Sequence, residues 1–146
     1  MIMEQSAKSG LVACNCMALR RAARSISNFY DGQLAPSGLR ATQFAILALV
    51  NTLEEASVNA VAERLALDRT TAGKNLRPLE AAGLVSIAPS KKDGRQRAIR
   101  LTKAGKAALK AAMPLWRRAQ TRFESANGAD KAAALRATLG SLKFQN

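Results

Sequence analysis

The feature that most constrains this chain is a charged turn set between two strand-like segments. Residues 84–88 are mostly apolar and residues 97–101 alternate in polarity, so the two predict a β-hairpin. Thr102 follows at once and is a typical N-cap for a helix. Four cations crowd the hairpin tip and repel one another in the isolated chain: Lys91, Lys92, Arg95 and Arg97. A bound polyanion such as the DNA backbone would relieve that repulsion.

The charge of the chain is large and uneven. Its 146 residues carry 23 Lys and Arg against 10 Asp and Glu, a formal net charge of +13. Nine of the cations and two acids fall in residues 69–103, whereas residues 41–68 hold one cation and four acids. Charge needed for solubility alone would be spread more evenly, so the asymmetry favours an acidic partner. A solvated basic face without a partner is the alternative that charge alone leaves open.

Length and composition predict one mainly helical domain over residues 1–146. A chain of this length can bury a core, and a hydrophobic content of 48% excludes general disorder. Aromatic residues make up only 4%, which favours packed helices over a large sheet. There is no run of 18 apolar residues, and residues 1–5 do not resemble a secretory signal. We therefore expect a cytoplasmic protein that does not span a membrane.

Apolar periodicity and capping residues divide the chain into six helices. The first covers residues 10–35 and ends at Pro36-Ser37-Gly38. The other five, with the N-caps that the sequence offers, are 42–51 (Thr42), 58–65 (Ser57), 69 onward (Asp68), 102–125 (Thr102) and 129–142. Pro78 either kinks the fourth helix or ends it near Arg77. Residues 51–56 form either a short turn or a small strand that joins the hairpin.

The fourth helix has two faces with different chemistry. At 100° per residue, Ala72, Leu76 and Leu79 point one way and are expected to pack on the third helix. The opposite face carries a hydroxyl, a side-chain gap and two cations, which suit a DNA major groove: Thr70, Gly73, Lys74 and Arg77. Two short helices and a basic hairpin make a winged helix-turn-helix over residues 40–101.

These segments carry a resemblance to a known family. The chain contains Asp68-Arg69-Thr70-Thr71, then Leu79-Glu80-Ala81-Ala82-Gly83-Leu84, then Asp93 and Arg95 followed by Leu101-Thr102 and Gly105. Tyr30-Asp31, Gly38-Leu39-Arg40 and Thr42-Gln43-Phe44 precede them. In this order and spacing, the chain from about Leu11 to Leu142 resembles the MarR family of bacterial transcription regulators.

The resemblance implies a homodimer, held by residues 10–35 and 102–143, that binds a pseudo-palindromic operator in double-stranded DNA. Recognition helices are expected in successive major grooves and wings in the flanking minor grooves. Arg95 is the residue expected to enter the minor groove, and Asp93 to orient it. The full set of expected DNA contacts is Arg69, Thr70, Thr71, Gly73, Lys74, Arg77, Lys91, Lys92, Asp93, Arg95 and Arg97. Repression is the behaviour that the resemblance favours.

The same resemblance implies a signal that releases the DNA. Members of the family sense small aromatic compounds in a crevice of the dimer, or organic hydroperoxides through a first-helix cysteine. Cys16 matches the position of that cysteine and Tyr30 that of a supporting tyrosine, whereas the other two tyrosine positions hold Arg20 and Ala41. The alternative is that Cys16 is a small buried residue. A disulfide to Cys14 within a helix is not expected, because residues two apart point in different directions.

Catalysis and metal binding find no support in the sequence. The chain has no histidine, and it contains no glycine-rich phosphate loop or zinc motif. Two cysteines without histidine offer too few ligands for a metal. We therefore expect no enzyme activity, no cofactor and no metal. A nonspecific basic nucleic-acid-binding protein is the alternative function, because a charge of +13 permits it.

Overall fold

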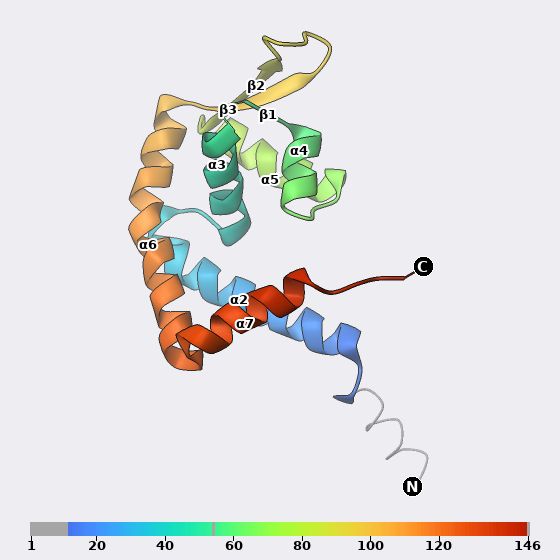
Figure 1. Cartoon of the computed structure of the whole chain (residues 1–146). Helices are drawn as coiled ribbons and strands as arrows, with labels where there is room; N and C mark the ends of the chain where they lie inside the picture. The colour runs from blue at the N-terminus through green and yellow to red at the C-terminus, as the bar shows by residue number, and fades with distance from the viewer. Residues whose placement is uncertain (1–11, 54, 146) are drawn as a thin grey trace, which may run out of the picture.

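The computed structural model describes residues 12–53 and 55–145, and it is mainly helical (Figure 1). Within these ranges, seven helical segments and three short strands follow one another: α2 (Asn15–Leu34), η1 (Ala35–Ser37), α3 (Ala41–Leu53), β1 (Ala56–Ser57), α4 (Val58–Arg64), α5 (Arg69–Ala81), β2 (Val85–Pro89), β3 (Arg97–Leu101), α6 (Lys103–Asn127) and α7 (Ala129–Gly140). Among these helices, none is both long and apolar enough to cross a membrane. The first predicted helix included residues 10 and 11, which lie outside the described part of the chain.

The strands form one small antiparallel sheet in the order β1-β3-β2. Strands β2 and β3 are the predicted hairpin, paired from Val85 opposite Leu101 to Pro89 opposite Arg97. Strand β1 adds Ala56 opposite Ile99 on the other edge of β3. The wing therefore has three strands rather than two. A small strand does join the hairpin, but of residues 51–56 only Ala56 belongs to it, and residues 51–53 are the end of α3. Ile99, in the central strand, is fully buried.

Three of the four predicted N-caps are confirmed. Ser57 accepts a hydrogen bond from the Ala60 N–H, Asp68 from Thr71 and Thr102 from Gly105, each at 2.8–3.0 Å. Thr42 was the wrong choice for α3, because that helix already begins at Ala41. The carboxylate of Asp31 reaches over from α2 and accepts the Ala41 N–H at 2.7 Å.

Helix α5 continues through Pro78 to Ala81, so the proline does not end it. The continuation places Leu79 in the core, where it joins Leu76 from the previous turn. Around them gather buried side chains from α3, the sheet and α6, including Ile46, Leu47, Val50, Ile99 and Leu109. Helix α5 is thus packed against the body of the domain from Ala72 to Leu79.

Helix α6 starts directly against the root of the hairpin. The Thr102 backbone N–H donates to the Leu84 carbonyl at 3.1 Å, and its hydroxyl donates to the Gly83 carbonyl at 2.5 Å. Gly105 lies close to the Leu84 carbonyl as well: a Cβ at position 105 would be 1.9 Å from the Leu84 oxygen. Only glycine fits this position without moving the backbone of Leu84.

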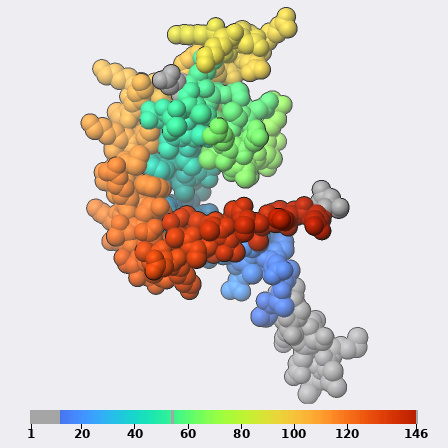
Figure 2. Space-filling model, in the orientation of Figure 1, coloured from blue at the N-terminus to red at the C-terminus, as the bar shows by residue number. Residues whose placement is uncertain are grey.

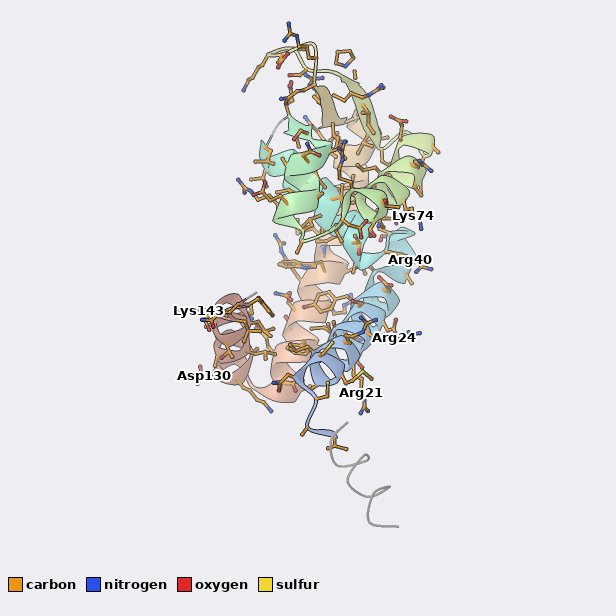
Figure 3. All side chains as sticks on the ribbon, turned by 90° about the vertical axis from the view of Figure 1, so that its right-hand side faces the viewer. Arg21, Arg24, Arg40, Lys74, Asp130 and Lys143 are labelled. Carbon is orange, nitrogen blue, oxygen red and sulfur yellow. The ribbon has the colours of Figure 1, made fainter. Side chains whose placement is uncertain are left out.

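The lower half of α6 carries the terminal helices. Helices α2 and α7 both contact α6 and lie on either side of it in Figure 3. The Tyr30 hydroxyl of α2 donates to Gln120, and Arg122 of α6 donates to the Gln33 side chain at 2.9 Å. Burial, and then the nearby Glu124 carboxylate, raises the pKa of Tyr30, so its hydroxyl stays protonated and able to donate at neutral pH.

Candidate nucleic-acid interface

Helix α5 has the two faces that the sequence predicts. Ala72, Leu76 and Leu79 are buried against the body of the domain. On the opposite face Thr70, Lys74 and Arg77 are exposed and Gly73 is half-buried. Figure 3 shows Lys74 pointing outward from this helix. A hydroxyl and two cations are therefore free to meet a ligand along one side of the helix.

The N-terminus of α5 is fixed by two hydrogen bonds from Thr71 to the Asp68 side chain. The Asp68 carboxylate accepts the Thr71 backbone N–H and the Thr71 hydroxyl, both at 2.8 Å. These hydrogen bonds lower the pKa of Asp68, the backbone one most, so the cap is charged and intact at neutral pH. The Thr71 hydroxyl is committed to this cap, whereas Thr70 beside it is exposed and has its side chain free of the cap.

The turn between β2 and β3 projects beyond the helical body (Figure 2). Its backbone is folded around two side chains. The Ser90 hydroxyl accepts the N–H groups of Lys92 and Asp93 at 3.1 and 3.3 Å, and the Asp93 carboxylate accepts the Arg95 N–H at 3.0 Å. Asp93 thus holds the backbone of Arg95. Among the described residues the Asp93 carboxylate forms no ion pair, so the Arg95 guanidinium is left to a ligand.

A groove of about 570 Å³ runs between this turn and the starts of α4 and α5. Three of the predicted cations line it: Arg69, Arg95 and Arg97. They come from two separate segments of the chain, and the groove brings them together. A phosphate backbone lying here would be met by positive charge from the wing and from the recognition helix at once.

Two polar residues in this groove are absent from the predicted set. Asn59 lies in the first turn of α4, and Gln96 follows Arg95 in the wing; both line the groove. Gln96 also closes the turn, since its N–H donates to the Asp93 carbonyl at 3.0 Å. Neither residue is charged, so the pattern of basic residues does not point to them. Asn59 is also far from the wing in sequence, and only the position of α4 beside the wing shows that it lines the groove.

The remaining cations of the wing differ in their availability. Lys91 and Lys92 are exposed at the turn, as predicted. Arg100 is not available, because its guanidinium is paired with the Glu55 carboxylate. The basic set therefore ends at Arg97, on the side of the sheet that faces the groove.

The two residues considered for oxidant sensing lie apart within one chain. Cys16 is exposed in the first turn of α2, and Tyr30 is fourteen residues further on, about 21 Å along the axis. Cys14 is half-buried and stands just before the helix, as its extended N-cap residue. Within the described residues no three cysteine, aspartate or glutamate side chains gather as a metal site would require.

A recognition helix, a helix packed across it and a three-stranded wing with a basic groove between them define a winged helix-turn-helix protein, a class that binds DNA. Several solved structures share this fold, among them the following three. The transcriptional regulator MosR of M. tuberculosis is 36% identical, with 88% of this chain and 93% of that one covered and a TM-score of 0.76. The repressor CouR of Rhodococcus jostii, bound to a 23-mer DNA duplex, is 28% identical over 90% and 93%, with a TM-score of 0.80.

A probable transcriptional regulator of Pseudomonas aeruginosa has the same fold, with a TM-score of 0.81 at 23% identity, covering 91% of this chain and 99% of that one. No curated protein sequence matches the chain. The MarR family model matches residues 37–96, from the end of η1 to the tip of the wing. The chain belongs to the MarR family of transcription regulators, as the resemblance in sequence indicated.

Proposed function

We propose that this protein is a sequence-specific repressor that binds a pseudo-palindromic operator as a homodimer and is released from it by a small ligand or an oxidant. The observation that carries the proposal is the groove that Arg69, Arg95 and Arg97 line beside the exposed face of α5. In this proposal α5 reads bases and the groove holds the phosphate backbone, both on one side of the domain. MosR has also been solved in complex with DNA, which supports the same use of the fold here.

Binding to the DNA upstream of its own gene tests the proposal against nonspecific binding. Measured by fluorescence anisotropy, the affinity should exceed that for a scrambled duplex of equal length by about 10³-fold or more. Lys74→Ala and Arg77→Ala should each relax the base preference at particular operator positions, because these side chains lie on the exposed face of α5. Base substitutions at those positions should then cost the variant less affinity than they cost the parent. Equal weakening on both duplexes, with no operator preference in the parent protein, would instead make this a nonspecific binder.

The terminal helices support a homodimer. Large apolar side chains lie exposed just before α2, on α2, on α7 and beyond α7, with Leu19 at 42% and Leu135 at 45%: Val12, Met17, Leu19, Ile26, Leu135, Leu139, Leu142 and Phe144. Burying these side chains against a partner would remove apolar surface from water, which favours association. A second copy presenting the same helices would cover it, and two recognition helices would then face two operator half-sites.

Sedimentation velocity at micromolar concentration should give a particle of twice the 15.5 kDa chain mass. Leu139→Glu should shift it toward the monomer, because a carboxylate would be buried at the interface without a partner. Ala137→Glu adds the same charge on the opposite side of α7 and is the control, which should remain dimeric. A folded parent monomer at these concentrations would contradict the dimer.

The release signal has two candidate sites. The first is a shallow, mainly apolar hollow of about 250 Å³ between α2 and the start of α3, which suits a small aromatic ligand. It is lined by Ile26, Ser27, Tyr30 and Ala41. Cys16 is exposed and would be open to a hydroperoxide. The anisotropy assay separates the two: one equivalent of organic hydroperoxide should abolish binding, reversibly with dithiothreitol, only if Cys16 is the sensor.

A further inference from the structure

Glu55 joins the wing to the body of the domain. It lies between α3 and β1, immediately before the strand that pairs with β3. One carboxylate oxygen accepts the Ser90 hydroxyl at the base of the wing turn, and the other accepts the Arg100 guanidinium of β3. Of the side-chain hydrogen bonds in the described residues, the one to Ser90 alone connects residues 90–96 with a segment outside the hairpin.

The Ser90 hydroxyl connects Glu55 to the tip of the turn. While its proton is donated to Glu55, its oxygen accepts the N–H groups of Lys92 and Asp93. Asp93 in turn accepts the Arg95 N–H. An unbroken series of hydrogen bonds therefore runs from the α3–β1 junction to the backbone of the residue expected in the minor groove.

The charge of Glu55 is part of this arrangement. The hydrogen bond from Ser90 has the largest effect on the carboxyl and lowers its pKa; burial raises it, and the Arg100 guanidinium lowers it again. The net result is a lowered pKa, so the group is ionised at neutral pH. An anion stands beneath a turn that carries Lys91, Lys92 and Arg95, where it offsets their mutual repulsion before any DNA arrives.

We propose that Glu55 is a positioning residue, which acts through Ser90 to hold the wing turn, and with it Arg95, in the orientation that DNA requires. The proposal rests on the proposed function as a DNA-binding regulator. A turn fixed in advance loses less conformational freedom when it enters a groove, so binding is tighter than it would be with a mobile turn.

This role predicts the opposite of what charge alone predicts. Glu55→Ala removes an anion from a surface that meets a polyanion, so simple electrostatics would make binding tighter. If Glu55 positions the wing, binding instead weakens, by about fivefold or more. Glu63 lines the same groove as Arg95, and its side chain forms no hydrogen bond within the described residues. Glu63→Ala therefore removes an anion without releasing the wing, and as the matched control it should bind DNA more tightly than the parent.

Two measurements test the proposal. In the free protein, amide hydrogen exchange at Lys92, Asp93 and Arg95 should become about tenfold faster in Glu55→Ala and Ser90→Ala, while Ser90→Thr, which keeps the hydroxyl, should match the parent. In anisotropy, the double variant Glu55→Ala/Ser90→Ala should bind DNA no more weakly than either single variant, because the two substitutions remove the same hydrogen bond.

Unchanged exchange in both single variants, or tighter DNA binding by Glu55→Ala as by Glu63→Ala, would overturn the proposal. Ser90→Ala leaves the α3–β1 junction intact, so it tests the connection even if Glu55→Ala fails to fold. The exchange experiment needs no DNA, and it therefore distinguishes a failure of this inference from a failure of the proposed function.

Discussion

Gly105→Ala is expected to destabilise the protein by about 3 kcal/mol or more, because the added methyl group has no room. Its carbon would lie 1.9 Å from the Leu84 oxygen and 2.9 Å from the Leu84 carbonyl carbon. Both atoms belong to the backbone, and the oxygen already accepts the Thr102 N–H. Relief requires that α6 and the root of β2 move apart, which breaks that bond. Thermal unfolding followed by circular dichroism should show a midpoint lower by roughly 6–12 °C.

Gly32→Ala and Gly73→Ala provide the control for this experiment. Both glycines are inside helices, and a Cβ at either would meet nothing within 4 Å. Alanine there should stabilise the fold by roughly 0.5–1 kcal/mol through helix propensity. If Gly105→Ala unfolds at the temperature of the parent protein, α6 does not approach β2 as closely as described.

Arg95→Ala is expected to weaken operator binding by roughly 10–100-fold, equivalent to about 1–3 kcal/mol for one guanidinium lost from a groove. The side chain stands at the tip of the wing, lines the groove with Arg69 and forms no ion pair within the described residues. Its loss should also lower the salt dependence of binding by about one unit of slope. The fold should be unaffected, since Arg95 is exposed.

The control for Arg95→Ala must remove the same charge at a place that DNA does not reach. Lys110 is exposed on α6 and does not line the groove. Anisotropy titrations from low to physiological salt should show that Lys110→Ala changes the affinity little. Equal losses in the two variants would mean that Arg95 contributes only to the overall charge, and the minor-groove role would be abandoned.

Local chemistry accounts for what the sequence could predict of this fold. Ser57, Asp68 and Thr102 cap helices through contacts only three residues away, so residue type and spacing were sufficient. The buried and exposed faces of α5 follow from helical periodicity in the same way. The hairpin followed from two short strand patterns around a basic turn. Each of these features depends on neighbours along the chain.

Contacts between distant residues account for what could not be predicted. The sequence predicts Thr42 as the cap of α3, but Asp31 caps it by accepting the N–H of Ala41, ten residues further along the chain. Strand β1 has two residues and no periodicity of its own, and it exists because β3 pairs with it. Asn59 joins the candidate site only because α4 lies beside the wing. The bridge from Glu55 to Ser90 spans thirty-five residues and has no signature in sequence.

The contact between Gly105 and Leu84 also connects helix α6 directly to the wing. Because the two backbones touch, the start of α6 cannot tilt toward β2 without pushing the strand, and the wing with it. Further along, Gln120 and Arg122 fasten α6 to α2. A tilt of α2 would therefore displace α6 through these side-chain contacts, and the close approach of Gly105 to Leu84 would carry that displacement to the wing.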